Sequence, residues 1–123
     1  MILKIRTVNE NNFEIAIISS DKILIRDIQS ALDLMATIQY ETGSSRLILH
    51  KSAFCEDFFQ LRTKLAGEIL QKFVNYGVKL AIVGDFSVYT SKSLQDFIYE
   101  CNQGKEIFFL PDEKQAIEKL SVV

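Results

Sequence analysis

The sequence lacks tryptophan and contains only one proline and two cysteines among its 123 residues. Cys55 and Cys101 stand in neither a CxxC pattern nor another metal-ligand spacing, so we expect no metal site and no disulfide. Each lies in an apolar neighbourhood, where cysteine commonly acts as a small hydrophobic side chain. Low-complexity segments, internal repeats and interdomain linkers are also missing. We therefore expect one domain over residues 1–123.

An excess of charge of either sign is also absent. The 14 basic and 16 acidic side chains are interspersed and leave a net charge of −2. Proteins that bind nucleic acid usually carry a basic surplus, so we expect no nucleic-acid partner. No apolar run approaches the roughly 20 residues that cross a bilayer, and Lys4 and Arg6 come too early for a signal peptide. We expect a cytoplasmic protein that has no membrane partner.

What the sequence does contain is a large apolar fraction arranged in ordered periods. Apolar residues make up 48% of the chain and charged residues 24%, which is typical of a packed globular domain. β-rich runs over residues 2–8 and 13–18 flank the turn residues 9–12, which predicts a hairpin. Asp27 precedes apolar residues at spacings of three and four from Ile28 to Ile38, which predicts a capped helix.

Strands and helices alternate over the rest of the chain. Strands are predicted over residues 46–50, 78–83 and 106–110, with helices over Glu56–Asn75, around Leu94–Cys101 and after Pro111. Gly67 lies inside the longest predicted helix at a cost of about 1 kcal/mol relative to Ala, which suggests close contact with a neighbouring element.

The resulting order is ββαβαβαβα. It predicts an α/β fold with a single mixed five-stranded sheet, whose last three strands are parallel and joined to an N-terminal hairpin. The expected core consists of the apolar faces of the central strands and crossover helices: Leu47, Leu49, Leu65, Ile69, Phe73, Leu80, Ile82, Leu94, Phe97, Ile98 and Phe108.

Three stretches of sequence resemble a known family. FFQLRTKLAGEILQKF at residues 58–73, VKLAIVGDFS at 78–87 and LQDFIYE at 94–100 resemble a bacterial family catalogued as domain of unknown function 4180. This resemblance covers nearly the whole chain and implies no particular activity. By topology alone, the ββαβαβαβα order is also similar to the STAS fold of anti-sigma-factor antagonists and sulfate-transporter tails, and fold does not imply function.

Polar residues that could carry chemistry follow two of the predicted strands. His50, Lys51 and Ser52 end one strand, and Asp85 follows the next. Ligands usually bind outside the carboxyl ends of parallel strands, so His50 and Asp85 could approach each other. With Ser52, Ser87 or Cys55 they would supply the parts of a nucleophilic site, although no nucleophile motif accompanies them. The alternative is that His50 is structural or simply solvated.

The loop after the fourth strand is the other candidate, as a binding surface. Its residues with potential for binding a ligand or partner are Asp85, Phe86, Ser87, Tyr89, Ser91 and Lys92. Ser93 and Asp96 have the spacing of a capping box, although Thr90 or Ser91 could cap the helix instead. Lys92 at this helix start would favour an anion, and the alternative is a capped helix with a solvated lysine.

Clustered aromatic residues leave a choice between core and surface. Phe86 and Tyr89 either pack against a helix or belong to a partner surface, and among Phe54, Phe58 and Phe59 we expect one ring to point away from the core.

These patterns favour a non-enzymatic binding or regulatory module that takes an unidentified protein or small molecule and uses no cofactor. The alternatives are a small hydrolase or transferase that uses His50 and Asp85, and a structural oligomer such as a homodimer.

The cysteine usage gives the first testable prediction. Protein prepared without reductant and then denatured should release two titratable thiols, from Cys55 and Cys101, because neither is expected to pair. Labelling with a thiol reagent followed by mass spectrometry measures this directly. A stable bond between the two cysteines would contradict the cytoplasmic assignment.

Overall fold

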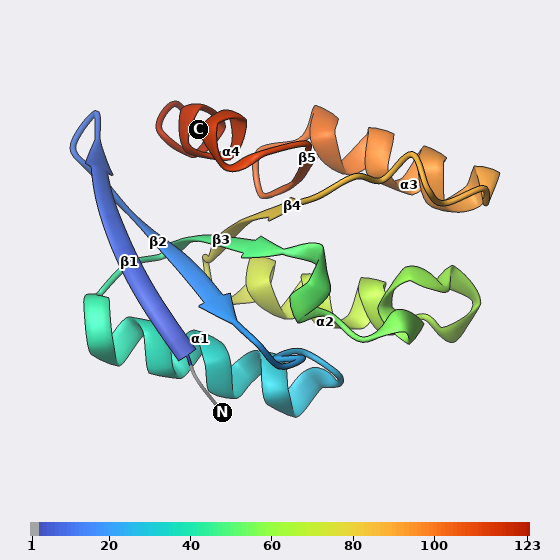
Figure 1. Ribbon diagram of the computed structural model, residues 1–123, viewed down its shortest axis with the longest axis horizontal. Helices are drawn as coiled ribbons and strands as arrows, with labels where there is room; N and C mark the ends of the chain where they lie inside the picture. Colours follow the sequence, from blue (N-terminus) through green and yellow to red (C-terminus); the bar gives the residue numbers. More distant parts are fainter. Residues whose placement is uncertain (1–2) are drawn as a thin grey trace.

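A computed structural model describes residues 3–123 and shows one five-stranded sheet with the strand order β1-β2-β3-β4-β5 (Figure 1). The strands are β1 Leu3–Glu10, β2 Phe13–Ser20, β3 Arg46–His50, β4 Lys79–Val83 and β5 Ile107–Leu110. β1 and β2 are antiparallel, whereas β2, β3, β4 and β5 pair in parallel. The predicted α/β class, the element order and the parallel strands are confirmed. The start of the first predicted run, at residue 2, lies outside the described residues.

The hairpin between β1 and β2 turns on two residues. Asn11 and Asn12 have φ angles of 53° and 68°, and Glu10 faces Phe13 across the turn. Two central residues with positive φ are typical of the type I′ turn, whose twist matches that of the flanking strands. Asparagine tolerates this conformation better than most residues. The predicted turn is therefore present, in a shorter form.

Four α-helices follow the predicted order: α1 Ile28–Thr42, α2 Leu65–Asn75, α3 Lys92–Gln103 and α4 Glu113–Leu120. Asp27 caps α1 by accepting a hydrogen bond from the backbone N–H of Ser30. α3 is capped by Ser91, whose Oγ accepts from the backbone N–H of Leu94. The capping box suggested by Ser93 and Asp96 is therefore wrong, because the helix begins earlier than that box requires.

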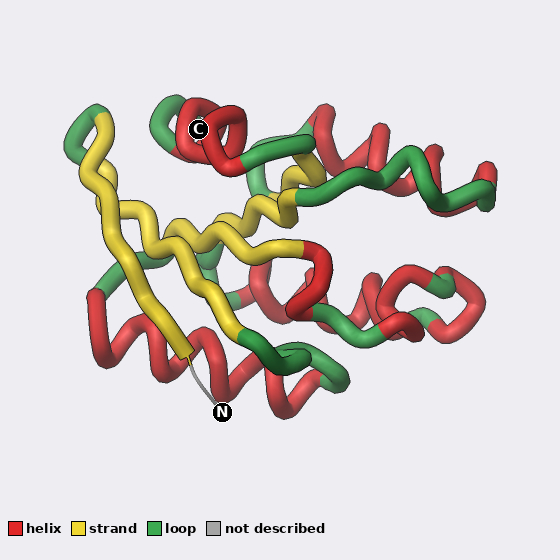
Figure 2. Tube along the Cα trace, in the orientation of Figure 1, coloured by secondary structure: helices red, strands yellow, loops and turns green. Residues whose placement is uncertain are grey.

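The helix predicted over Glu56–Asn75 is nine residues too long at its start, because α2 begins only at Leu65. The chain from residue 51 to 63 instead forms short 3₁₀ turns, η1 Lys51–Ala53, η2 Glu56–Phe59 and η3 Leu61–Thr63 (Figure 2). Lys64 separates them from α2 with a left-handed φ of 63°. Three-residue turns place apolar side chains at helix-like spacing, which explains the error.

Gly67 does not make the close contact that we expected from its position. It lies in the first turn of α2, is exposed, and a Cβ built on it would meet nothing within 4 Å. The expectation is wrong because it assumed that Gly67 lay in the middle of a longer, packed helix.

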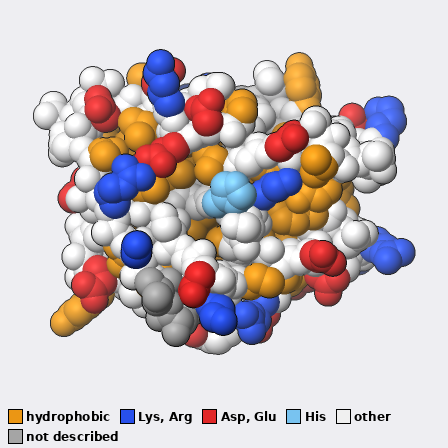
Figure 3. All heavy atoms as spheres, in the orientation of Figure 1, with side chains coloured by type: hydrophobic (Ala, Val, Ile, Leu, Met, Phe, Trp, Pro, Cys, Tyr) orange, Lys and Arg blue, Asp and Glu red, His pale blue; other side chains and the backbone are white. Residues whose placement is uncertain are grey.

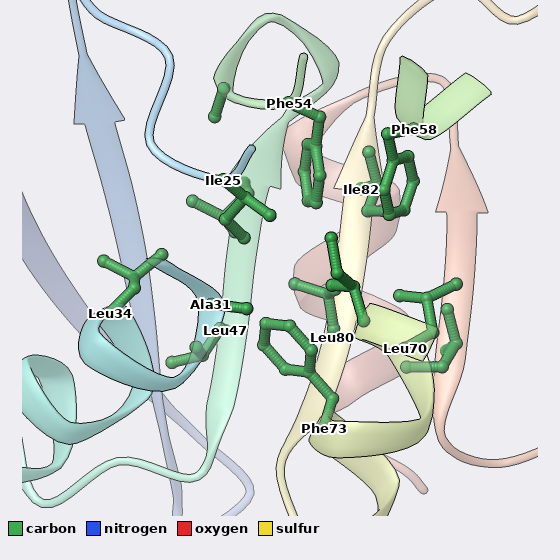
Figure 4. Close-up of a cluster of buried hydrophobic side chains, with 14 of the residues drawn as sticks. Ile25, Ala31, Leu34, Leu47, Phe54, Phe58, Leu70, Phe73, Leu80 and Ile82 are labelled. Atoms are coloured by element: carbon green, nitrogen blue, oxygen red, sulfur yellow. The ribbon is translucent and has the colours of Figure 1, made fainter. Parts of the chain in front are cut away.

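The core divides between the two faces of the sheet. α1, α2 and α3 contribute to the larger cluster on one face (Figure 4), and α4 covers a smaller cluster on the other. The predicted core residues are buried except Leu65 and Phe97, which are half-buried. Phe108 is buried as predicted, but it points to the α4 face, opposite its neighbours Ile107 and Phe109. This alternation follows from the period of two in a strand.

Both cysteines are free and half-buried. Burial raises the pKa of the Cys101 thiol to about 11, so this thiol stays protonated at neutral pH. No helix within residues 3–123 is long and apolar enough to cross a bilayer.

The open surroundings of Gly67 predict a stabilising substitution. Gly67→Ala should raise the free energy of unfolding by about 0.4–1 kcal/mol, because alanine restricts the unfolded chain and clashes with nothing in α2. Gly77→Ala is the matched control. Gly77 has a φ of +70°, so alanine should lower the free energy of unfolding there by about 1 kcal/mol. Urea unfolding of both variants measures the two signs, and a destabilised Gly67→Ala protein would contradict the open position of Gly67.

Candidate functional site

The carboxyl ends of β3, β4 and β5 meet at one edge of the sheet. His50 is in register with Val83, and Val83 with Leu110, so the residues that follow each strand emerge side by side. Figure 3 shows the histidine side chain near the middle of one face, next to a lysine or arginine side chain and a patch of hydrophobic side chains. This edge is where parallel sheets usually bind ligands.

Lys51 ties the ends of β3 and β4 together. Its Nζ donates a hydrogen bond of 2.7 Å to the backbone oxygen of Asp85. The lysine stem crosses directly over Gly84, where a Cβ would lie only 2.8 Å from Lys51 Cγ and Cδ. Gly84 has a φ of +152°, so glycine serves both the backbone conformation and the close approach. The ammonium also lies 5.0 Å from the ring centroid of Tyr89, within range of a cation–π contact.

Asp85 carries an exposed carboxylate that its neighbour holds in place. Its Oδ1 accepts hydrogen bonds from the Oγ of Ser87 at 2.5 Å and from the Ser87 backbone N–H at 3.0 Å. These bonds, with a smaller attraction to Lys51, lower the pKa of Asp85 below its usual value. The carboxylate is therefore ionised and oriented at neutral pH.

The loop that carries Asp85 is held in place by a hydrogen-bonding side chain of α3 and by aromatic side chains of the core. Nε2 of Gln95 on α3 donates to the backbone oxygens of Phe86 and Tyr89, both at 2.9 Å. The Tyr89 ring stacks on Phe59 with centroids 5.0 Å apart, and the Phe86 ring meets Phe109 edge-on at 5.4 Å. Phe86 and Tyr89 thus lie half-buried against the core.

The three phenylalanines before α2 lie in the core together. Phe54, Phe58 and Phe59 are 4%, 1% and 8% exposed, so the expectation that one of them points away from the core is wrong. In a regular helix three such rings would cover more than one face. Here the chain folds in 3₁₀ turns, and the parallel bridge between Ile25 and Phe54 pins it against the chain before α1. Neither Phe54 nor Phe59 is therefore available to a partner.

A shallow hollow of about 380 Å³ opens beside Asp85. Its walls come from the loop after β4 (residues 84–86), from residues 109–111 at and just after the end of β5, and from Ile98 of α3. The lining is largely apolar, and among the described residues that form it only Asp85 is ionisable. The hollow offers apolar contact and one carboxylate.

His50 is engaged locally and not with Asp85. Its Nδ1 accepts a hydrogen bond from the backbone N–H of Ser52 at 3.0 Å and lies 2.9 Å from Ser52 Oγ. The His50 side chain thereby caps the 3₁₀ turn that follows β3. In a neutral ring this leaves the proton on Nε2. Within residues 3–123 no hydrogen bond joins His50 to Asp85. The two share an edge of the sheet without forming the base–orienter pair that nucleophilic catalysis needs.

The remaining predicted residues belong to the start of α3. Ser91 is its N-cap, and Lys92 forms an exposed ion pair of 2.8 Å with Asp96, which raises the pKa of Lys92. The structure thus brings together Asp85, Phe86, Ser87 and Tyr89 from the predicted set. Sequence reasoning missed Gln95, which no pattern distinguishes from other polar helix positions, and the role of Lys51. The role of Lys51 could have been inferred from a lysine that directly follows one strand and a glycine, Gly84, that directly follows the next.

Comparison with known proteins identifies one family. A family model described as "Domain of unknown function (DUF4180)" matches residues 10–120. No curated protein and no solved structure matches the chain. In the described part of the chain, no group of three histidine, cysteine, aspartate or glutamate side chains could hold a metal ion.

The Asp85–Ser87 contact predicts a measurable pKa change. Ser87→Ala removes the hydroxyl donor, so the pKa of Asp85 should rise towards the ordinary value of about 3.9. Because the folded-state pKa of Asp85 is lowered, its contribution to stability is present above about pH 4 and is lost as the pH falls through the folded-state value. A ¹³C NMR titration of the Asp85 carboxyl carbon checks this, with the exposed Ser93→Ala as control. An unchanged titration in Ser87→Ala would contradict the assignment.

Proposed function

We propose that this chain, which belongs to the DUF4180 family of domains of unknown function, is a small non-enzymatic binding or regulatory module. The observation that carries the proposal is the exposed, oriented carboxylate of Asp85 beside an apolar hollow at the carboxyl edge of the parallel strands. A prearranged charged group lowers the entropic cost of binding, whereas nucleophilic catalysis would need a second reactive group coupled to it.

The chemistry of this hollow fits a cationic group on an apolar stem. An amine or guanidinium would meet the Asp85 carboxylate, and its hydrocarbon stem would lie against Phe86, Ile98 and Phe109. Such a group is carried by a free alkylamine or by a lysine or arginine of a partner protein. The small volume of the hollow, about 380 Å³, suits one side chain better than a large cofactor.

The bonding of His50 supports the binding module over the enzyme alternative. A hydrolase or transferase would need His50 as a base oriented by Asp85, but His50 Nδ1 is engaged with Ser52 and Asp85 Oδ1 with Ser87. Both partners lie two residues away along the chain. Such local bonds order turns, as side chains of this kind commonly do in loops.

We further propose that the architecture is STAS-like and that the protein acts in the cytoplasm of a bacterium. The sequential order of the strands and the placement of α4 opposite the other helices support the architecture. The absence of a charge surplus agrees with a partner other than nucleic acid.

The test is a titration of ¹⁵N-labelled protein with agmatine and, separately, with a capped tetrapeptide that carries one arginine. Amide shifts should concentrate at residues 84–87 and at Leu110, and Asp85→Asn should weaken binding at least tenfold because it removes the charge. The thermal midpoint of Asp85→Asn should move by only a few degrees, since this exposed carboxylate supports no core.

The controls separate the alternatives. Asp57→Asn removes another exposed carboxylate, which lies outside the hollow, and should leave binding unchanged. His50→Ala should also bind normally. Peptide binding without agmatine binding would identify a protein partner as the source of the cation. Binding that survives Asp85→Asn, or that disappears in His50→Ala, would overturn the proposal.

A further inference from the structure

β1 is an open edge of the sheet. It is eight residues long, pairs only with β2, and has no strand on its outer side anywhere in residues 3–123 (Figure 1). Its residues are all exposed or half-buried. The opposite edge, β5, is half as long and lies beside α3. A long open edge is a template for pairing with another strand.

The hairpin turn decides which backbone groups of β1 face outward. In a two-residue turn the flanking residues, here Glu10 and Phe13, form the closing hydrogen-bonded pair. Hydrogen-bonded and non-bonded pairs alternate along antiparallel strands, so Val8, Arg6 and Lys4 also bond to β2. The N–H and C=O groups of Asn9, Thr7, Ile5 and Leu3 therefore point away from the sheet.

The charges on β1 then select one register for a second copy. In symmetric antiparallel pairing, outward-bonding residues must face each other. A twofold axis at Arg6 would place Arg6 against itself, and an axis at Ile5 would place Lys4 against Arg6, both of which are repulsive. An axis at Thr7 places Lys4 of each copy against Glu10 of the other. An axis at Val8 pairs Arg6 with Glu10 but overlaps only over residues 6–10.

The Thr7-centred register also leaves existing contacts intact. Arg6 is already paired with Glu113 of α4 at 2.6 Å, so it needs no partner across the edge. Within the described chain, Lys4 and Glu10 form no ion pair of their own. Opposite charges directly across antiparallel strands stabilise pairing, and threonine pairs at the centre do so too.

We propose that two copies of this chain associate through their β1 edges, antiparallel and centred on Thr7, so that their sheets become continuous. This edge is remote in the strand order from the Asp85 site at β4 and β5, so the inference does not depend on the proposed function. A second copy is the partner because the Thr7-centred register forms two ion pairs, each between Lys4 of one copy and Glu10 of the other, while most of the strand is paired.

Sedimentation velocity over a range of concentrations tests the proposal. The wild-type chain should form a reversible dimer. Lys4→Glu and Glu10→Lys should each weaken the dimer by about tenfold, because each places like charges opposite one another twice. The double variant restores opposite charges and should dimerise nearly as well as wild type. Lys105→Glu and Glu41→Lys, which change exposed charges elsewhere, should have no effect.

Thr7→Pro gives an independent test of the backbone pairing. Proline removes the outward N–H at the centre of the proposed contact but none that the hairpin uses, so the monomer should fold normally by circular dichroism while the dimer is lost. A wild-type chain that is monomeric at every concentration would overturn the proposal. So would a dimer that survives Thr7→Pro, or one that the double charge exchange fails to restore.

Discussion

The aromatic ring of Phe59 lies where separate segments of the chain meet beneath the carboxyl edge of the sheet. It contacts Phe54 and Phe58 within its own segment of 3₁₀ turns, and Phe86 and Tyr89 from the loop after β4. Ring contacts of this kind contribute about 0.5–1.5 kcal/mol each beyond the area they bury. The loop that carries the candidate site is therefore part of the core on one side and open to solvent on the other.

Several contacts hold the exposed residue Asp85 and its loop in place. Gly84 lets the Lys51 stem cross the end of β4, and the Lys51 ammonium binds the Asp85 backbone. Ser87 then orients the Asp85 carboxylate, and Gln95 holds the loop from α3. A side chain that is already held in its binding conformation loses less conformational entropy when a ligand binds. The loop is packed on buried aromatic rings from one side, and its Asp85 carboxylate is exposed on the other.

Sequence patterns were sufficient for the parts of the fold that depend on local periodicity. The hairpin at Asn11–Asn12, the cap at Asp27 and the buried strands followed from residue types and their spacing alone. They failed between residues 56 and 64, where the apolar spacing suits both a helix and a succession of 3₁₀ turns. What decides between them is the left-handed Lys64 and the bridge of Ile25 to Phe54, a contact distant in the sequence.

At the site, residue types and their order along the chain were enough to predict that polar residues follow β3 and β4 and that parallel strands bring them to one edge. Which of these residues contact one another depends on the folded structure. His50 turns to Ser52, whereas Lys51 reaches Asp85 across Gly84. The physical reason is that hydrogen bonds between loops depend on distances of a few ångströms, which strand register sets and residue spacing does not encode.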